Sequence, residues 1–300
     1  MNRVPQHPIL AFSVALAAVG VLSIMDALMK ALVIALGIYA VSVWRSLVML
    51  VISSAAYLPR RRAWPSRPTL RIHIARGAVV MVMALLFFWG IGRVPLAQAI
   101  ALTFIAPLVA LLLAVLFLGE RIGPRAIVGS VTAFAGVLVI VVGQARGQLG
   151  PEVLLGSLAI VGSALCYAAN IVLMRRQAVA AKPLEIAFFQ SLVVAVLWLA
   201  VIAFAGLPQW PELGWWGWII VAATMSLAGA LLFAFAYARA DAGYLAVTEY
   251  SAFLWASVLG WLVFGEHVTG YTLAGALLIV AGCLIASRRV ADAPPEIEAA

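Results

Sequence analysis

Long apolar stretches, separated by short segments that carry charges, Gly or Pro, follow one another along nearly the whole chain. Each stretch has about 20 residues, enough for an α-helix to cross a hydrocarbon core of about 30 Å. Most lack the strict alternation of apolar and polar residues that is typical of membrane barrel strands. The pattern predicts an all-α polytopic membrane protein with ten transmembrane helices at 9–32, 37–58, 72–92, 96–118, 126–143, 153–173, 184–207, 215–237, 244–264 and 271–287.

A long segment of the chain occurs twice, because residues 84–140 align without a gap on residues 230–286. A bias toward Ala, Leu and Val does not supply the polar residues and glycines among the identical pairs. These pairs include Arg93/Arg239, Gly119/Gly265, Glu120/Glu266, Gly129/Gly275 and Gly136/Gly282. The sequence therefore indicates an internal repeat.

The repeat leads to an expectation about architecture. With five spans in each half, an odd number, the second half enters the membrane from the opposite side. We therefore expect two inverted five-helix repeats, at residues 1–147 and 148–289, followed by a disordered tail at 290–300. Carriers built in this way bind their substrates between the repeats.

Composition and charge predict where in the cell the protein lies and how it is oriented. A chain with 66% apolar and 10% charged residues and a mean hydropathy of +1.15 lies outside the soluble globular class. In a soluble protein the net charge of +8 would suggest a nucleic-acid partner, but here Lys and Arg concentrate in alternate loops. By the positive-inside rule, this distribution predicts a multi-pass protein of the bacterial inner (plasma) membrane, with both termini cytoplasmic and no nucleic-acid partner.

A charged residue at membrane depth costs about 2.5–3.5 kcal/mol on insertion scales, and five such residues are candidates for a role in structure or function. They are Asp26, Lys30, Arg45, Arg76 and Glu249. Asp26 and Lys30 are four residues apart, so their side chains share one helix face and can pair. In one interpretation, Lys30 and Arg45 belong to a structural ion-pair cluster with Asp26. In the other, these charges bind the carboxylate and ammonium of a zwitterion.

Glu249 has no Lys or Arg one turn away on its own helix. Its carboxylate is a candidate to bind a substrate amine, a cation or a proton, or else it reaches the inner surface. Arg76 lies near the inner end of its span, and we expect it to extend toward lipid phosphates. The three histidines, His73 among them, lie near predicted loops, so we expect no buried histidine.

Several aromatic and polar residues near the repeat boundaries are candidates to line a substrate cavity together with Asp26 and Glu249. They are Trp89, Gln98, Tyr167, Asn170, Tyr237, Tyr244 and Tyr250. Any one of these side chains can instead pack in the core or against lipid. Their joint placement favours a cavity, because inverted-repeat carriers bind at the interface between halves.

Each repeat has a Gly-Glu pair at the end of a span, Gly119-Glu120 in the first and Gly265-Glu266 in the second. A Gly that ends a helix, followed by a carboxylate, suits a tight turn in which Glu accepts hydrogen bonds from free N–H groups of the next helix. Pro107 removes a backbone hydrogen bond inside its span and predicts a kink. Small residues on one face allow close helix packing within the protomer or in a dimer, namely Gly129, Gly136, Gly275 and Gly282.

Common enzyme signatures are absent from the sequence. It contains no His-Glu-x-x-His zinc motif, no Gly-x-Ser-x-Gly elbow and no P-loop. We therefore expect a protein that is not an enzyme, with no cofactor and no catalytic or metal-binding residues.

The closing segments of the two halves resemble those of the drug/metabolite transporter superfamily, and within it the EamA-type carriers and their YddG-type amino-acid exporters. The residues that carry the resemblance are Pro107-Leu108, Gly119-Glu120, Gly129, Gly136, Gly265-Glu266, Gly275 and Gly282. The second half departs from the pattern with Phe253 where such carriers often have Pro. The resemblance implies a secondary transporter without ATP hydrolysis, whose central cavity lies between two five-helix repeats.

We therefore expect a carrier that exports amino acids, aromatic and apolar ones included, by alternating access. Its partners would be these small molecules and the lipid bilayer, and the protein would be a monomer or a weak homodimer. One alternative is an uptake carrier for a cationic or heteroaromatic metabolite, like S-adenosylmethionine or riboflavin. Another is a channel or assembly protein without coupled transport.

Overall fold

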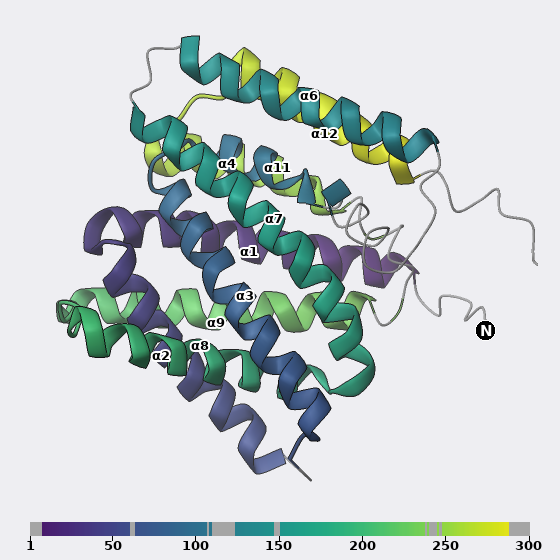
Figure 1. Cartoon of the computed structure of the whole chain (residues 1–300). Helices are drawn as coiled ribbons and strands as arrows, with labels where there is room; N and C mark the ends of the chain where they lie inside the picture. The colour runs from purple at the N-terminus through teal and green to yellow at the C-terminus, as the bar shows by residue number, and fades with distance from the viewer. Residues whose placement is uncertain are drawn as a thin grey trace, which may run out of the picture.

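A computed structural model of the chain describes residues 8–60, 64–106, 108–109, 124–146, 151–237, 239, 245 and 248–287. The regular elements in these ranges are all helices (Figure 1). They are α1 Pro8–Leu36, α2 Ile38–Tyr57, the 3₁₀ helix η1 Leu58–Arg60, α3 Arg67–Ile91, α4 Leu96–Thr103, α6 Pro124–Arg146, α7 Pro151–Ala180, α8 Pro183–Ala205, α9 Leu213–Tyr237, α11 Ser251–Phe264 and α12 Gly270–Ser287. Four predicted site or hinge residues lie outside the described ranges: Pro107, Gly119, Glu120 and Tyr244. The expected tail at 290–300 also lies outside them.

The helices confirm a multi-pass membrane protein. Six of those described, α1, α2, α3, α7, α8 and α9, contain stretches long and apolar enough to cross a bilayer. Shorter apolar helices occur within α6, α11 and α12. The total of ten spans stays a prediction, because the segments 96–118 and 244–264 are described only in part.

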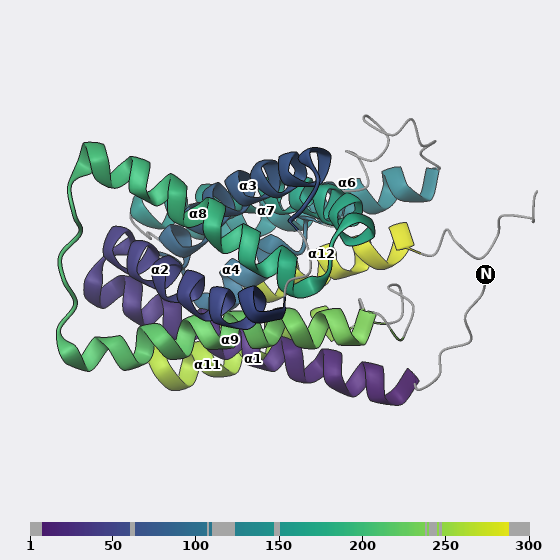
Figure 2. The same ribbon diagram turned by 90° about the horizontal axis from the view of Figure 1, so that it is seen from below.

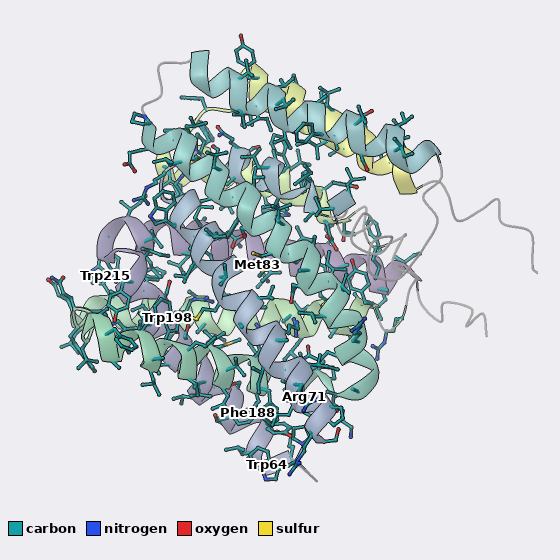
Figure 3. The ribbon with its side chains drawn as sticks, in the orientation of Figure 1. Trp64, Arg71, Met83, Phe188, Trp198 and Trp215 are labelled. Atoms are coloured by element: carbon teal, nitrogen blue, oxygen red, sulfur yellow. The ribbon has the colours of Figure 1, made fainter. Side chains whose placement is uncertain are left out.

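Long helices from the two halves of the chain pack side by side. α1 lies along α9, α3 along α7 and α2 along α8, and the α6–α12 pair forms a separate layer at the edge of the bundle (Figures 1 and 2). The main core fills the space where α1, α3 and α4 meet, around Met29, Leu32, Ile91 and Leu102. A smaller aromatic cluster joins α2 and α8 around Phe188, which is labelled in Figure 3. The rings of Tyr57 and Phe188 stack 4.9 Å apart.

The two ends of the bundle are named after α1, as the Pro8 end and the Leu36 end. α3 runs in the same direction as α1, since its C-terminal Gly92 packs against Val33. α9 runs in the opposite direction, since Ala236 near its C-terminus packs with Ala11 and Ala15. The C-terminus of α3 therefore lies at the Leu36 end, and the C-terminus of α9 at the Pro8 end.

Glycines bring α6 and α12 into backbone contact. A Cβ added to Gly136 would lie 2.6 Å from the carbonyl oxygen of Gly275, and one added to Gly282 would lie 2.5 Å from that of Gly129. Side chains at these positions would force the helices apart. The small-residue faces found in the sequence therefore pack against each other within the protomer.

Candidate functional site

Lys30 of α1 is buried and forms an ion pair with Glu266, which follows α11. Its Nζ also donates to the carbonyl oxygen of Val94 at 2.6 Å. The other oxygen of Glu266 accepts a hydrogen bond from the N–H of Leu96 at 2.7 Å. The structure thus gives Lys30 a different partner from the expected Asp26, and this cluster joins α1, α4 and the α11–α12 connection at the Leu36 end.

The Gly-Glu turn of the second half has two functions. Gly265 ends α11 with φ 65°, a left-handed conformation that favours glycine. Glu266 binds the first N–H of α4 rather than one of α12, where its negative charge complements the helix dipole. The sequence predicts the turn, but it does not identify the helix that the carboxylate caps.

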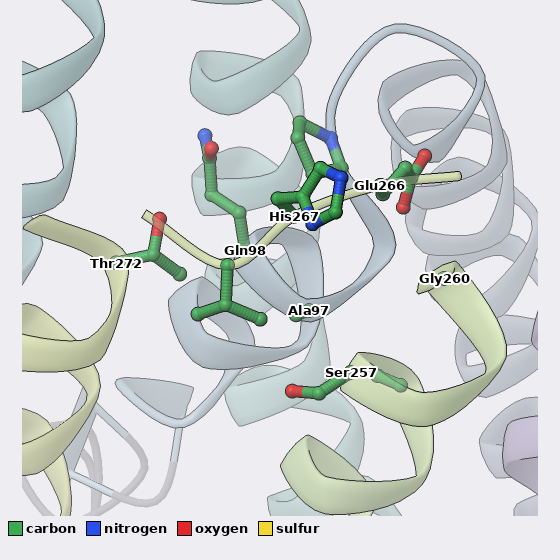
Figure 4. A pocket seen from close by; sticks show the side chains of 10 residues that line it. Ala97, Gln98, Ser257, Gly260, Glu266, His267 and Thr272 are labelled. Atoms are coloured by element: carbon green, nitrogen blue, oxygen red, sulfur yellow. The ribbon is translucent and has the colours of Figure 1, made fainter. Parts of the chain in front are cut away.

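A pocket next to this cluster is too small for a metabolite. Gln98, Ser257, Glu266, His267 and Thr272 line it (Figure 4). Its free volume of about 10 Å³ corresponds to about one water molecule. The Gln98 amide, a predicted cavity residue, donates instead to Ser157 at 3.2 Å.

Asp26 and Arg45 face each other without a direct bond. The Nη1 of Arg45 donates to the Ser226 hydroxyl at 3.3 Å, and its guanidinium lies 5.1 Å from the centre of the Phe88 ring. The buried Nε of Arg45 has no hydrogen-bond partner in the part of the chain that the structure describes. Asp26 interacts with Arg45 through space, but within those same residues it forms no ion pair or hydrogen bond.

Packing between α1 and α9 puts Asp26 at the depth of Ser226. The two helices are antiparallel and meet where Leu22 approaches Gly229. One turn after Leu22 on α1 is Asp26, and it therefore lies beside Ser226, about one turn before Gly229 on α9. The Asp26 backbone is about 15 Å along α1 from the Leu36 end at 1.5 Å per residue. Asp26, Arg45, Ser226 and Phe88 thus form a central charged site.

A second polar network joins α3 and α7 nearer the Pro8 end. Arg76 is buried, and it donates Nε to the Asn170 side chain at 2.8 Å and Nη1 to the Gln177 side chain at 2.5 Å. His73 is fully buried between Gln177, at 2.5 Å, and Glu185, at 3.4 Å. The expectations that Arg76 reaches lipid phosphates and that no histidine is buried are therefore wrong.

Side-chain spacing could have revealed this network. His73 and Arg76 are three residues apart on α3, and Asn170 and Gln177 are seven apart on α7, so each pair shares one helix face. The pair Asn170 and Gln177 was missed because the predicted span, 153–173, ended before Gln177. In the structure α7 continues to Ala180, since the satisfied polar side chains allow the helix to extend.

Glu249 accepts a hydrogen bond from the Tyr237 hydroxyl at 2.5 Å. The Tyr167 hydroxyl lies close enough to both Glu249 and Arg76 to interact electrostatically with each. The Tyr250 ring packs edge-on against Phe104, with centroids 5.4 Å apart. Four predicted residues, Tyr167, Asn170, Tyr237 and Glu249, thus lie in the Pro8 half of the bundle together with Arg76.

Trp89 lies apart from these residues, at the Leu36 end. The Arg93 guanidinium stacks 3.7 Å from its ring centre and forms an ion pair with Glu152 at 2.8 Å. This exposed pair fits the role of an anchor between α3 and α7.

The charges inside the bundle fall into two groups. Within the described ranges, Lys30 forms an ion pair with Glu266, His73 forms a hydrogen bond with Glu185, and Arg93 forms an ion pair with Glu152 nearer the surface. Asp26, Arg45, Arg76 and Glu249 form no ion pair among these residues. Unpaired charges at membrane depth are costly and mark sites of function, so these four residues define the candidate site.

Sequence comparison identifies the family. The EamA-like transporter family matches residues 9–142 and again residues 154–288. The chain belongs to this family. Membership confirms a membrane transporter of the EamA and drug/metabolite transporter type, whereas the narrower resemblance to YddG-type amino-acid exporters receives no specific support.

Similar proteins of this family carry different metabolites. The pseudopaline exporter CntI of Pseudomonas aeruginosa PAO1 is 29% identical over 276 residues, covering 89% of this chain and 92% of that protein. The riboflavin transporter of Vibrio cholerae is 27% identical, with 78% and 79% covered. The S-adenosylmethionine uptake transporter of Rickettsia felis is 27% identical, with 73% and 71% covered. All three are transporters rather than enzymes.

A crystal structure of another protein supports the fold. It matches with a TM-score of 0.61 and covers 96% of this chain and 100% of its own, at 20% sequence identity. At this identity the likeness shows the fold alone.

Proposed function

We propose that this EamA-family protein is a secondary carrier that exports amino acids, aromatic and other apolar ones included. The observation that carries the proposal is the central charged site, where Asp26 and Arg45 lie at one depth without bonding to each other. An amino acid supplies both missing partners. Its ammonium pairs with Asp26, and its carboxylate accepts hydrogen bonds from the guanidinium of Arg45.

The surroundings of the central charged site favour an apolar side chain on the substrate. The Phe88 ring lies beside Arg45, and the neighbouring Met25 and Met29 of α1 belong to the apolar core. Small-molecule sites use a few polar groups for orientation and apolar walls for the rest of the ligand. A zwitterion with an aromatic or aliphatic side chain meets both requirements.

Alternating access through two inverted repeats, at residues 1–147 and 148–289, is part of the proposal. In this arrangement α1, α2 and α3 of the first repeat correspond to α7, α8 and α9 of the second. Helix packing supports it, because the α1–α9 contact then corresponds to the observed α7–α3 contact, and the α2–α9 contact to the observed α8–α3 contact. The second family match, at residues 154–288, falls within the proposed second repeat. In the proposed orientation, both termini and the Pro8 end face the cytoplasm.

Uptake of a cationic metabolite is the second candidate. It is favoured by Glu249, whose carboxylate bonds to a neutral tyrosine, and by relatives that transport S-adenosylmethionine. S-adenosylmethionine carries an α-ammonium and a carboxylate beside its sulfonium, so it could engage Asp26 and Arg45 through the same two groups, whereas a cation without a carboxylate would leave Arg45 unpaired and would be repelled by it. The central charged site therefore fits a zwitterion better than a simple cation.

Counterflow into proteoliposomes tests the proposal. Liposomes preloaded with L-phenylalanine should accumulate labelled L-phenylalanine, and Asp26→Asn and Arg45→Gln should each slow this at least tenfold. A control, Glu152→Gln, removes an exposed carboxylate and should keep the wild-type rate. If Arg45→Gln fails to fold, Arg45→Lys takes its place; it retains the charge and should keep part of the activity. Exchange of riboflavin or S-adenosylmethionine without exchange of any amino acid would overturn the proposal.

A further inference from the structure

The four unpaired charges lie at two depths, and α3 gives the distance between them. The guanidinium of Arg45 contacts Phe88 near the C-terminus of α3. Arg76 belongs to the same helix, and at 1.5 Å per residue it lies about 18 Å from Phe88 toward the Pro8 end.

α9 gives an independent measure for the two acidic residues. Ser226 of α9 lies at the depth of Asp26 and bonds to Arg45. Tyr237 ends the same helix about 16 Å away at 1.5 Å per residue, and its hydroxyl holds Glu249 at 2.5 Å. Measured along either helix, Arg76 and Glu249 both lie well toward the Pro8 end from the central charged site.

Arg76 retains donor capacity at this depth. Its Nε and Nη1 donate to the neutral amides of Asn170 and Gln177, and no described residue accepts a hydrogen bond from its Nη2. The amides fix the plane of the guanidinium without neutralising it. A fixed guanidinium of this kind suits a carboxylate.

Glu249 is the acidic counterpart of Arg76. One carboxylate oxygen accepts from Tyr237, and no described residue donates to the other. Tyr167 lies three residues before Asn170, so it shares the face of α7 that holds Arg76, and it also interacts electrostatically with Glu249. The pair therefore repeats the chemistry of Asp26 and Arg45 nearer the Pro8 end.

We propose that Arg76 and Glu249 form a second binding station for zwitterionic amino acids, in which Arg76 binds the carboxylate and Glu249 the ammonium. This inference rests on the proposed function. The ammonium and carboxylate of an α-amino acid are attached to one carbon atom, so one molecule cannot engage both depths at once. Substrate entering from the Pro8 end binds first at this station and then moves to the central charged site.

Transport measured from each face of the membrane tests the station. In membrane vesicles of the two orientations, Glu249→Gln and Arg76→Lys should raise KM for L-phenylalanine at least tenfold when substrate is offered at the Pro8 face. KM at the Leu36 face should change less than twofold. Arg76→Lys keeps the charge but lacks the planar fork that serves two amides and a carboxylate together. Glu152→Gln serves as the matched control and should leave both KM values unchanged.

Substrate analogues identify which group each residue binds. At the Pro8 face, the wild-type protein should prefer L-phenylalanine to its methyl ester, which lacks the carboxylate, and to N-acetyl-L-phenylalanine, which lacks the ammonium. Arg76→Lys should reduce the preference over the ester, and Glu249→Gln the preference over the acetylated compound.

The results separate this inference from the proposed function. Wild-type KM values at both faces for Glu249→Gln and Arg76→Lys, with transport still dependent on Asp26, would overturn the station and leave the proposed function intact. An equal rise in KM at both faces would assign Arg76 and Glu249 a structural role and would also overturn it. Failure of the wild-type protein to transport any amino acid would overturn both proposals.

Discussion

Replacing Lys30 by Met tests whether the buried cluster at the Leu36 end holds the helices together. The substitution keeps most of the length of the side chain but removes its charge and three donors. Among the residues that the structure describes, it leaves the Glu266 carboxylate with only the N–H of Leu96, and it leaves the Val94 carbonyl without Lys30 as its donor. The expected consequence is a buried, uncompensated negative charge.

The expected loss in free energy of unfolding depends on the Glu266 carboxylate, which loses its cationic partner. Breaking a buried ion pair by removing one partner costs about 3–5 kcal/mol, whereas hydrogen bonds between membrane helices average about 0.6 kcal/mol in double-mutant cycles. Because the orphaned group is a carboxylate at 17% side-chain exposure, we expect Lys30→Met to lower the free energy of unfolding by about 3 kcal/mol. Lys30→Met combined with Glu266→Gln removes the orphaned charge and should recover about 2 kcal/mol of that loss.

Unfolding by SDS in mixed micelles, followed by tryptophan fluorescence, measures these differences. The control is Arg93→Met, which breaks the more exposed pair with Glu152 and should cost no more than about 1 kcal/mol. A free energy of unfolding for Lys30→Met within about 0.5 kcal/mol of wild type would refute the reasoning, as would additive effects of the two substitutions.

Three further substitutions test the packing. Gly136→Val places atoms against the Gly275 carbonyl, where even a Cβ would lie at 2.6 Å, and should lower the free energy of unfolding in the SDS titration by about 2 kcal/mol. Gly265→Ala should cost about 1–2 kcal/mol in the same titration, because the backbone there has φ 65°. Trp44→Phe removes the 3.0 Å hydrogen bond to the Gln209 carbonyl, so the α8–α9 connection should be cut faster by protease. Wild-type behaviour of any of the three would contradict the corresponding contact.

Local patterns predicted much of the fold. Apolar length predicts the membrane helices, and the Gly-Glu pair predicts the end of α11 at Gly265, because both depend on residues close together in the chain. Glycine spacing likewise predicts close helix packing at these faces, although the structure was needed to show that α6 and α12 are each other's partners. The expected spans were too short for α3 and α7, where polar residues near the helix ends are satisfied by other helices.

The partners of the charged residues could not be predicted in the same way. Asp26 is one turn from Lys30 in sequence, yet the partner of Lys30 is Glu266 from the other half of the chain. Arg76 and His73 were expected at the surface because they lie near the start of a span, but α7 and α8 cover them with Asn170, Gln177 and Glu185. These contacts depend on how distant helices pack, which local spacing does not determine.

Binding of a zwitterion and of its one-charge analogues to the purified protein tests the central claim most directly. Titration calorimetry with L-phenylalanine, its methyl ester and N-acetyl-L-phenylalanine compares the wild-type protein with Asp26→Asn and Arg45→Gln. We predict that the wild-type protein binds L-phenylalanine at least tenfold more tightly than either analogue. Asp26→Asn should lose the preference over the acetylated compound, and Arg45→Gln the preference over the ester. Equal affinity of the wild-type protein for all three compounds would contradict the claim that Asp26 binds the ammonium and Arg45 the carboxylate of the substrate.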